Sequence, residues 1–454
     1  MKKLRGSSPR LRRPRLSEAK NRITPTFRIL PAVPEEPAGG LLPSQVQTGM
    51  RWSIFEGGFA QVFLNTTTGS FVTALTLFLG ASDFVLGLVT SLPVLTQLVQ
   101  LPAAWMVEHR GNRRALTVWS SLGRLFWLVP VVLLFVPMDP VLRLWLVVAA
   151  IALAWSLLAI SSNAWLSWMS DLIPPTLRGR FFGTRNTVLA LVGLVVIFGG
   201  GSLLDFARQN GHPEVGFAVL YGAACVAGLL STVFISRQPE PKLVRVPGGM
   251  GFGQMLQAPL RDKSFRAFIL TMTIWGIGVN LGVPFFSAQA LKNLHVSYQQ
   301  LATLDMTTVA VGILTAPLWG RWADRAGHRL ALTVSMIGAS PLALTWLFVT
   351  PANIWLLYCN NIMSGIFWTG VNLALNNRLM ERAPAAGRSG YLALYSAITG
   401  VAAFAASLIG GIIANALAGG NYSLGPLPIN NYQAIFLIAG LTRIGVVVFR
   451  RRTL

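Results

Sequence analysis

The sequence has 454 residues, of which 53% are hydrophobic and only 11% are charged. A soluble domain carries about 25% charged residues, so water cannot be the main solvent of this chain. Apolar runs of about 20 residues recur from Trp52 to Phe449, and each is long enough to cross a hydrocarbon core of about 30 Å. The composition excludes a soluble fold. It predicts an all-α, polytopic membrane protein, because helices satisfy their own backbones in lipid.

The net charge of +22 is the second global feature, and its distribution decides what it means. Of the 37 Lys and Arg residues, 32 fall in the N-terminal segment, the even-to-odd loops or the C-terminal residues 450–452. Only Arg143, Arg208 and Lys292 fall in the opposite loops. This asymmetry follows the positive-inside rule, so we expect an integral protein of the plasma (inner) membrane with both termini cytoplasmic. It also argues against nucleic acid as a partner.

Residues 1–52 form the first predicted region, a basic cytoplasmic tail. The first 50 residues hold ten Lys or Arg residues and several prolines, and no apolar run long enough for a signal-peptide core. We expect disorder here, with an attraction to anionic lipid of about 1 kcal/mol per cation near the surface. Because Met50 directly precedes the first span, the sequence leaves both Met1 and Met50 open as the translation start.

Twelve spans are predicted, six on each side of a central linker. The N-terminal bundle, residues 53–236, has spans at 53–79, 84–107, 113–137, 142–168, 180–205 and 215–236. The C-terminal bundle, residues 265–454 with a short basic tail, has spans at 265–290, 298–320, 329–350, 352–378, 388–418 and 432–449. Residues 237–264 between them are basic and rich in Pro and Gly, which indicates a cytoplasmic linker.

The two halves of the sequence also repeat each other. One set of residues recurs 210 positions later: Asp171, Pro174, Arg178, Gly200 and Gly201 become Glu381, Pro384, Arg388, Gly410 and Gly411. A second set recurs 216 positions later: Glu108, Gly111 and Arg113 become Asp324, Gly327 and Arg329. A duplicated six-span unit is the simplest explanation. Parallel repeats of this kind are a transporter architecture, with the solute site near mid-membrane where the halves meet.

The stretch from Gly320 to Arg329, GRWADRAGHR, resembles the loop motif Gly-x-x-x-Asp-Arg-x-Gly-x-Arg of the major facilitator superfamily. The corresponding loop of the first half, residues 104–113, is similar, but Ala104 replaces the glycine and His109 the cation. Residues 171–179 before span five also resemble the family pattern. Together with the twelve spans and the linker, the resemblance covers nearly the whole chain. It implies the fold of that family and alternating access, and it leaves the substrate open.

The loop motif suggests a gate at the cytoplasmic end. Asp324 ends span eight, where it can face the partially positive start of span five near Gly179, and Glu108 would face span eleven in the same way. For Asp324 we favour gating over a topology signal, because a topology signal needs no carboxylate. For Glu108 both interpretations stand. The candidate gating residues are Glu108, Gly111, Arg113, Asp171, Arg178, Gly320, Asp324, Arg325, Gly327, Arg329, Glu381 and Arg388.

In the family that the motif resembles, spans one, four, seven and ten line the central cavity. Here each of them carries uncharged polar or aromatic side chains; on span ten, Asn361, Trp368 and Asn372 share one helical face. The alternative is that such amides bond between helices, at under about 1 kcal/mol each. Taken as a set, we expect a solute cavity lined by Gln61, Asn65, Asn163, Trp275, Asn280, Asn361, Trp368 and Asn372.

Among the ionisable residues within the predicted spans, where a charge normally marks function, we weigh four. Glu56 follows Ser53 with the spacing of a capping box, so we favour helix capping over proton transfer. For Asp305, about two turns into span eight, proton coupling and a structural hydrogen bond remain open. Arg124 needs a partner that the sequence does not identify, whereas Arg443 is expected to snorkel to the cytoplasmic face. The candidates for proton coupling are therefore Glu56, Asp305 and Arg124.

The motifs that the sequence lacks narrow the function. It has no Gly-x-x-x-x-Gly-Lys-Ser/Thr, no His/Cys metal spacing and no nucleophile elbow, so we expect no enzyme and no cofactor. We predict a secondary transporter of a small solute that works as a monomer in the lipid bilayer. The alternative is a transport-inactive scaffold, or a pigment- or lipid-handling protein, on the same fold. Drug export is not favoured, because the Gly-Pro element of drug–proton antiporters is missing.

Overall fold

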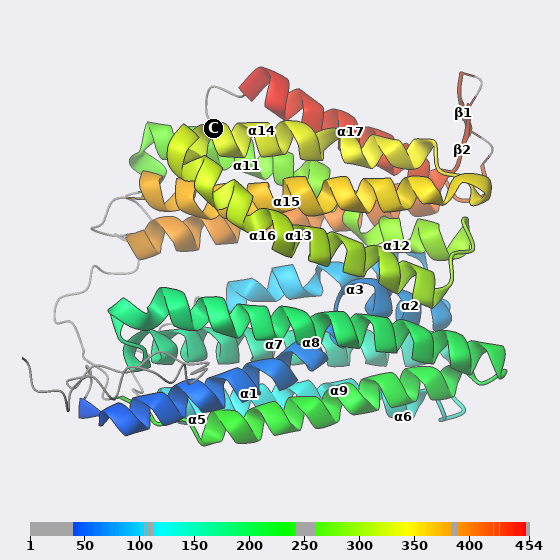
Figure 1. Cartoon of the computed structure of the whole chain (residues 1–454). Helices are drawn as coiled ribbons and strands as arrows, with labels where there is room; N and C mark the ends of the chain where they lie inside the picture. Colours follow the sequence, from blue (N-terminus) through cyan, green and yellow to red (C-terminus); the bar gives the residue numbers. More distant parts are fainter. Residues whose placement is uncertain are drawn as a thin grey trace, which may run out of the picture.

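The computed structural model of the chain describes residues 40–100, 102–103, 106, 112–241, 259–383, 388–420, 422–425 and 427–450. Within these residues the chain forms two bundles, one above the other in Figure 1, each built from six helical segments. A short antiparallel hairpin of β1 (Tyr422–Leu424) and β2 (Leu427–Ile429) joins the last two segments, which the sequence did not indicate. The prediction of an all-α, polytopic membrane protein is confirmed.

The N-terminal bundle holds segments one to six. The first is broken at Thr68 and the second and third contain tighter 3₁₀ turns, so several helices share one span. In chain order the elements are α1 (Pro43–Thr67), α2 (Gly69–Phe78), α3 (Asp83–Leu95), η3 (Thr96–Val99), α5 (Arg113–Ser121), η4 (Leu122–Trp127), α6 (Leu128–Leu133), α7 (Pro140–Leu172), α8 (Pro175–Gln209) and α9 (Pro213–Ser236).

The C-terminal bundle holds segments seven to twelve and repeats this pattern. Its first segment is broken at Leu281–Gly282, in the position that corresponds to the break in the first half. The elements are α11 (Lys263–Asn280), α12 (Val283–Lys292), α13 (Tyr298–Ala326), α14 (His328–Ala339), η5 (Ser340–Leu347), η6 (Pro351–Asn353), α15 (Trp355–Arg382), α16 (Arg388–Ala416) and α17 (Asn431–Arg450).

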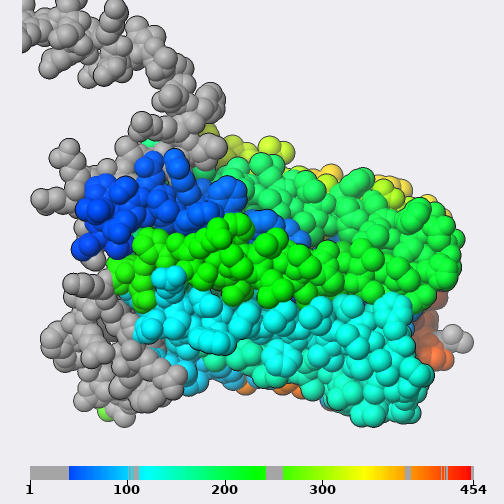
Figure 2. Space-filling model, turned by 90° about the horizontal axis from the view of Figure 1, so that it is seen from below, coloured from blue at the N-terminus to red at the C-terminus, as the bar shows by residue number. Residues whose placement is uncertain are grey.

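The outer surface of the bundles is apolar, as contact with lipid requires. Figure 2 shows one such face, where α1, α9 and the segment from α5 to α6 lie side by side. The exposed residues of α9 include Val219, Val226, Leu229 and Val233. Nine helical segments among the described residues are long and apolar enough to cross a membrane. The others are the broken first segment, the short second one and α15, which carries several amides.

The first helix begins at Pro43, ten residues before the predicted boundary at residue 53. The extra turns carry Val46 and Met50, which are fully buried in a cluster with Trp168 of α7. Packing against a neighbouring helix, and not hydropathy, therefore defines this start. The predicted tail of residues 1–52 loses its last ten residues to α1. Residues 1–39, for which we expected disorder, lie outside the described part of the chain.

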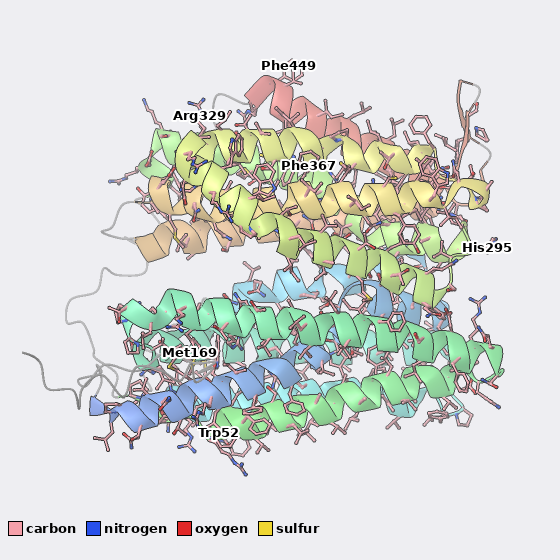
Figure 3. The ribbon with its side chains drawn as sticks, in the orientation of Figure 1. Trp52, Met169, His295, Arg329, Phe367 and Phe449 are labelled. Atoms are coloured by element: carbon pink, nitrogen blue, oxygen red, sulfur yellow. The ribbon has the colours of Figure 1, made fainter. Side chains whose placement is uncertain are left out.

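The two ends of the molecule differ, and we name them by the predicted orientation. The inner end carries the start of α1, the start of α11 and the end of α17, and the outer end carries the hairpin (Figure 1). Arg329 lies at the inner end and His295 at the outer end (Figure 3).

The bundles approach each other closely at two of the repeated glycines, at the outer end. A Cβ atom on Gly201 of α8 would lie 2.6 Å from Ala302 Cβ of α13, and one on Gly411 of α16 would lie 2.8 Å from the Asp83 carbonyl oxygen of α3. The repeated glycines therefore mark two related helix crossings between the bundles.

Candidate solute cavity and gates

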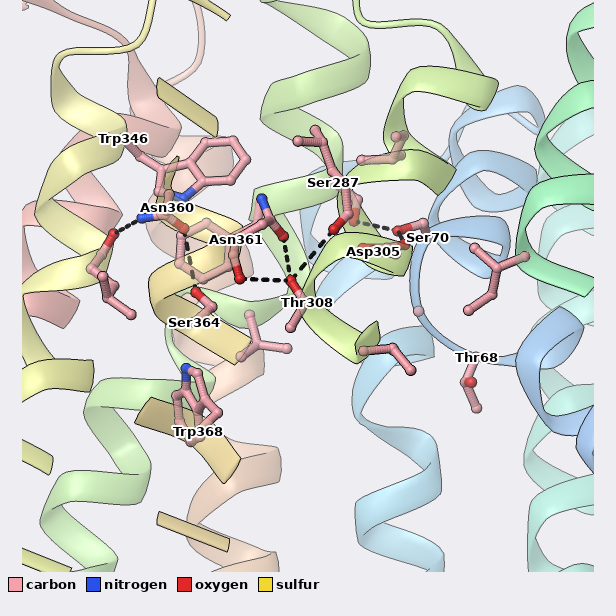
Figure 4. Close-up of a pocket in the computed structure, with 18 of the residues that line it drawn as sticks. Thr68, Ser70, Ser287, Asp305, Thr308, Trp346, Asn360, Asn361, Ser364 and Trp368 are labelled. Carbon is pink, nitrogen blue, oxygen red and sulfur yellow. Dashed lines mark hydrogen bonds between the residues drawn. The ribbon is translucent and has the colours of Figure 1, made fainter. Parts of the chain in front are cut away.

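A cavity of about 530 Å³ lies between the two bundles. Its walls come from α1, α2 and α8 of the N-terminal bundle and from α12, α13, η5, α15 and α17 of the C-terminal bundle, and Figure 4 shows many of these residues. Both broken segments reach it, through Thr68 to Ser70 on one side and Val283 to Ser287 on the other. Broken helices near the middle of the membrane expose backbone and polar side chains, which is how transporters commonly build a solute site.

The polar groups of the cavity are fixed by hydrogen bonds within its wall. Ser70 Oγ donates to Asp305 Oδ2 at 2.6 Å and lies 3.2 Å from Ser287 Oγ, so these contacts cross between the bundles. Thr308 Oγ1 donates to Asn361 Oδ1 at 2.7 Å, and Asn361 Nδ2 donates in turn to the Leu357 carbonyl within its own helix. The cavity therefore presents oriented polar groups rather than mobile ones (Figure 4).

Arg443 is buried in the C-terminal bundle and lines the cavity, so the expectation that it snorkels to the cytoplasmic face was wrong. Its Nε donates to the Gly278 carbonyl at 3.0 Å and its Nη2 to the Val279 carbonyl at 3.1 Å. These carbonyls lie at the end of α11, where the break removes the regular helical pattern. An unpaired carbonyl in the membrane costs several kcal/mol, and Arg443 supplies a donor to the Gly278 carbonyl and a second donor to the Val279 carbonyl, which also accepts from the Gly282 amide at 3.2 Å.

The structure brings three of the eight predicted cavity residues into the wall: Asn65, Asn361 and Trp368. Gln61 lies next to them, because its amide donates to Asn65 Oδ1 at 3.0 Å. Trp275 lies behind the wall, with its ring 5.3 Å from that of Trp368 and its Nε1 3.3 Å from Ser340 Oγ.

The other three predicted cavity residues lie away from the wall. Asn280 donates to the Gly276 carbonyl of its own helix, Asn163 is half-buried in α7, and Asn372 is exposed on α15. The wall also contains four residues that sequence reasoning missed: Ser70, Ser287, Thr308 and Trp346. Thr308 and Trp346 lie on spans eight and nine, which were not among the four expected. Ser70 and Ser287 lie on spans one and seven, but beyond the breaks in these helices, which the sequence did not indicate.

Glu56 does not cap a helix, so that preference was wrong: α1 begins at Pro43, and Glu56 lies in its middle. The carboxylate is buried and pairs with Arg185 of α8, with 3.1 Å between Oε2 and Nη2. Arg185 also donates to the Ser53 carbonyl at 3.2 Å and stacks on the Trp165 ring at 4.7 Å. The pairing residue is 129 positions away in sequence, so no local pattern could indicate it.

The partner that Arg124 requires is Glu56, which it reaches through Ser231; Glu56, Arg185, Ser231 and Arg124 form one polar cluster. Arg124 Nη1 donates to Ser231 Oγ at 2.9 Å, and the Ser231 hydroxyl donates to Glu56 Oε1 at 3.3 Å. A further bond reaches the Gly228 carbonyl at 3.3 Å. The Glu56 carboxylate thus lies between two guanidinium groups, with Ser231 as a bridge to the second. This arrangement compensates the Glu56 charge and ties four helical segments of the N-terminal bundle together.

Asp83, at the start of α3, is the centre of the first contact that closes the outer end, and sequence reasoning missed it. Its Oδ1 accepts hydrogen bonds from Tyr432 Oη at 2.6 Å and from Lys292 Nζ at 3.2 Å, both from the C-terminal bundle. Asn431 Nδ2 donates to Oδ2 at 3.2 Å. The Asp83 backbone amide donates to Asn415 Oδ1 at 3.1 Å. Asp83 is therefore held by four groups of the second bundle, three of them on its carboxylate.

Asp205, near the end of α8, makes the second contact at the outer end. Its carboxylate accepts from the backbone amides of Tyr298 at 3.0 Å and Gln299 at 2.8 Å, in the first turn of α13. Asp205 and Asn415 are separated by 210 positions, the offset of the sequence repeat. Applying that offset to polar residues at the outer helix ends would have found this pair.

The predicted gating residues at the inner end stay within their own bundles. Arg113 is fully buried; it forms an ion pair with Asp171 and lies 3.7 Å from the carboxylate of Glu240. Arg178 donates to the Ile173 carbonyl at 3.1 Å. Glu381 pairs with Arg378 at 3.0 Å and lies 3.8 Å from His328. Among the described residues, no hydrogen bond or ion pair joins the bundles at this end.

The loop motif of the second half lies at the exposed end of α13. Gly327 has φ 90° and forms the tight turn to α14, as expected. Asp324, Arg325 and Arg329 are exposed, and a Cβ on Gly320 would meet only Leu373, at 4.0 Å, so no close helix packing occurs there. Glu108 and Gly111 lie outside the described residues, as does the side chain of Arg388.

Comparison with known proteins agrees with this geometry. The model of the Major Facilitator Superfamily matches residues 268–453. The crystal structure of the nucleoside transporter NupG has a TM-score of 0.62 at 12% identity and covers 90% of this chain and 98% of that one. A bacterial homolog of the human lysosomal transporter Spinster, in an inward-facing and unoccupied conformation, has a TM-score of 0.63 at 15% identity, covering 90% and 97%.

The family model thus covers the C-terminal bundle, and the solved structures share the fold of this chain over 90% of its length. The chain is similar to the class H tetracycline resistance protein of Pasteurella multocida, with 29% identity over 157 residues, or 34% of this chain and 38% of that protein. The class E protein of Escherichia coli is 33% identical over 154 residues, or 33% and 36%. The chain therefore matches little more than a third of the length of these curated relatives. Proteins of this superfamily and fold are normally not enzymes.

Proposed function

We propose that the chain is a secondary transporter that moves a small solute by alternating access, with the cavity between the bundles as its binding site. The observation that supports this is the difference between the two ends of the cavity. At the outer end, Asp83 and Asp205 bind groups of the opposite bundle. At the inner end, the described residues form no hydrogen bond or ion pair between the bundles. A central site held shut on one side is the arrangement that alternating access requires.

We further propose that the inner end faces the cytoplasm, so that both termini and the linker are cytoplasmic, in a plasma (inner) membrane. The charges support this orientation. Arg113, Arg178 and Arg329 represent the many cations near the inner end, whereas Arg143 and Lys292 are among the few at the outer end. With this orientation, the structure is an inward-facing state of a transporter that functions as a monomer.

For coupling to protons, we propose Asp305 over Glu56 and Arg124. Glu56 pairs with Arg185 and receives a bond from Ser231, so its charge is already compensated. Asp305 lines the cavity and, within the described part of the chain, accepts a hydrogen bond only from the neutral Ser70, so it can exchange a proton with any water that enters. A buried carboxylate with no cationic partner among the described residues is the better proton carrier.

Drug export is a second candidate for the transported solute. The similarity to tetracycline resistance proteins favours it, although it extends over only about a third of the chain. Drug susceptibility of cells that express the protein separates this from import of a nutrient: export predicts a raised inhibitory concentration that Asp305→Asn abolishes. The transport-inactive alternative predicts no solute flux in proteoliposomes under any gradient.

The proposed mechanism is tested by measuring both ends of the cavity in a variant without the native Cys225 and Cys359. Spin labels at Thr176 and Ala326 report the inner mouth, and labels at Asn210 and His295 report the outer mouth. Alternating access predicts two populations in which the inner distance shortens as the outer one lengthens. One unchanging distance at both mouths, across pH and in the presence of every ligand found, would overturn the mechanism.

The binding site is tested by thermal-shift screening of the purified protein against metabolites and drugs. Asn361→Trp fills the cavity and is expected to abolish the shift caused by each ligand found. Asn372→Trp is the matched control, because Asn372 lies on the same helix but is exposed. Equal ligand shifts in both variants would place the binding site elsewhere.

The proposed orientation is tested by labelling single cysteines in intact cells. A cysteine in place of His295 at the outer end should react with an impermeant reagent. A cysteine in place of Ser264, at the start of α11, should react only after the cells are opened. Reaction of the Ser264 position in intact cells would contradict the proposed orientation.

A further inference from the structure

We propose that the cavity selects an amphoteric solute, one that carries a cationic and an anionic group on an aromatic frame. Asp305 would face the cation and Arg443 the anion. This inference rests on the proposed function, because it names the class of solute for the same cavity. It starts from the ionisable residues of the wall, which are only these two among the described residues that line the cavity.

The charge of Asp305 is left for a ligand. Its Oδ2 accepts from Ser70 at 2.6 Å, and no Lys, Arg or His of the described residues pairs with either oxygen. The neighbouring Ser287 is also neutral. Because an uncompensated charge in the membrane costs several kcal/mol, a cationic group of a solute gains by reaching this carboxylate.

The charge of Arg443 is left for a ligand as well. Nε and Nη2 each donate to a backbone carbonyl, and both carbonyls are neutral. No carboxylate among the described residues pairs with this guanidinium. Arg124 provides the contrast, because Ser231 links its guanidinium to the carboxylate of Glu56. Arg443 is held in place by its bonds and keeps the Nη1 donors for an acceptor in the cavity.

The other residues of the cavity wall suit the flat, apolar aromatic part of such a solute. Trp346, Trp368 and Phe286 supply aromatic surface, and Asn361 and Thr308 supply amide and hydroxyl groups. The formal charges of the wall sum to zero. A solute with a single charge would therefore compensate one ionisable residue and leave the other unpaired, whereas an amphoteric solute compensates both.

Three dyes on one xanthene frame test this selection. Rhodamine B carries a cationic xanthene and a free carboxylate, its ethyl ester is only cationic, and fluorescein is anionic. Equilibrium binding to the purified protein in nanodiscs, followed by fluorescence polarisation, needs no transport. We expect wild type to bind rhodamine B at least about tenfold more tightly than either of the other two dyes, as one lost charged hydrogen bond predicts.

The variants assign each charge to its residue. Arg443→Gln should bind rhodamine B and its ester equally, and Arg443→Lys, which keeps the charge, should retain part of the preference. Asp305→Asn should lose affinity for rhodamine B and for the ester, and not for fluorescein. Glu214→Gln, at a half-buried site of the outer end away from the cavity, is the control for a lost carboxylate and should behave as wild type.

Two results would overturn the inference. One is the absence of saturable rhodamine B binding. The other is that wild type and Arg443→Gln show the same order of affinities for the three dyes. These outcomes differ from failure of the proposed function. A protein that binds rhodamine B selectively but shows no flux and one fixed conformation would retain the selection and lose the transport mechanism. A protein that alternates between two states but binds the three dyes with equal affinity would retain the transport mechanism and lose the selection.

Discussion

The carboxylate of Asp205 caps the first turn of a helix in the opposite bundle, with 2.8 Å between its Oδ2 and the backbone nitrogen of Gln299. Asp205 lies near the end of α8, whereas Gln299 follows the first residue of α13. The start of a helix carries a partial positive charge, so this contact stabilises the closed outer end. It is the counterpart, at the other face of the membrane, of the gate that the loop motif suggests for Asp324.

Asp205→Ala should therefore raise the outward-open population. A carboxylate at a helix start contributes up to about 2 kcal/mol when partly buried, and 1.4 kcal/mol changes a ratio about tenfold. Spin labels at Asn210 and His295 would measure the change. Asp139→Ala is the control, because Asp139 caps α7 within its own bundle. A change of the same size in both variants would show a general effect of lost capping.

Gly201→Leu should prevent closure of the outer end. A Cβ at this position would already lie 2.6 Å from Ala302 Cβ and 2.8 Å from the Tyr298 carbonyl oxygen, so the larger side chain forces α8 and α13 apart. We expect a loss of the inward-facing state and of transport. Gly199→Leu, two positions earlier, meets no atom within 4 Å and should leave both unchanged. Equal transport by the two variants would show that this crossing is not required.

Glu56→Ala should lower the stability of the protein and leave the pH dependence of transport unchanged. Removing one member of a buried ion pair costs about 3–5 kcal/mol, because the other charge remains without a partner. The thermal unfolding temperature in detergent measures this, and replacing Arg185 with Gln in the same chain should restore part of the loss. A shifted pH profile without loss of stability would instead return Glu56 to the candidates for proton coupling.

Asp324→Asn should increase the inward-open population. In the structure Asp324 is exposed and makes no hydrogen bond with another described residue, so the change leaves this state as it is. We propose that it destabilises the opposite state, in which Asp324 faces the start of α8. Labels at Thr176 and Ala326 would report the shift, and Asp262→Asn, which alters a cap within one bundle, is the control. An unchanged distribution would leave Asp324 as a topology signal.

The helices could be located from the sequence because lipid imposes a simple rule. Each span must be apolar over about 20 residues, and the rule located all twelve segments. It failed where burial comes from a neighbour: residues 43–52 are helical because Val46 and Met50 pack against α7, although this stretch is too polar to read as a span. Hydropathy predicts which residues contact lipid, but it does not predict which residues pack between helices.

The polar groups were harder to place, because their roles depend on residues far away in the sequence. Glu56 has the local spacing of a capping residue, yet Arg185 decides its role. Arg443 lies close enough to the chain end to snorkel, yet the carbonyls at the α11 break hold it inside. Asp83 carries no local signal at all. The repeat offset was the one sequence feature that reached across such distances, and it relates Asp205 to Asn415.

The short helix α12, which follows the break after α11, connects two contacts that lie far apart in the molecule. At its base, Arg443 holds the last carbonyls of α11, and at its tip Lys292 holds Asp83 across the outer gate. An anion bound to the Arg443 guanidinium therefore acts on the end of α11 and, through the break, on α12, the ten-residue helix that contacts the outer gate. Thermodynamic linkage makes such a coupling mutual: the factor by which a bound solute shifts the contact between Lys292 and Asp83 is the factor by which that contact shifts solute affinity.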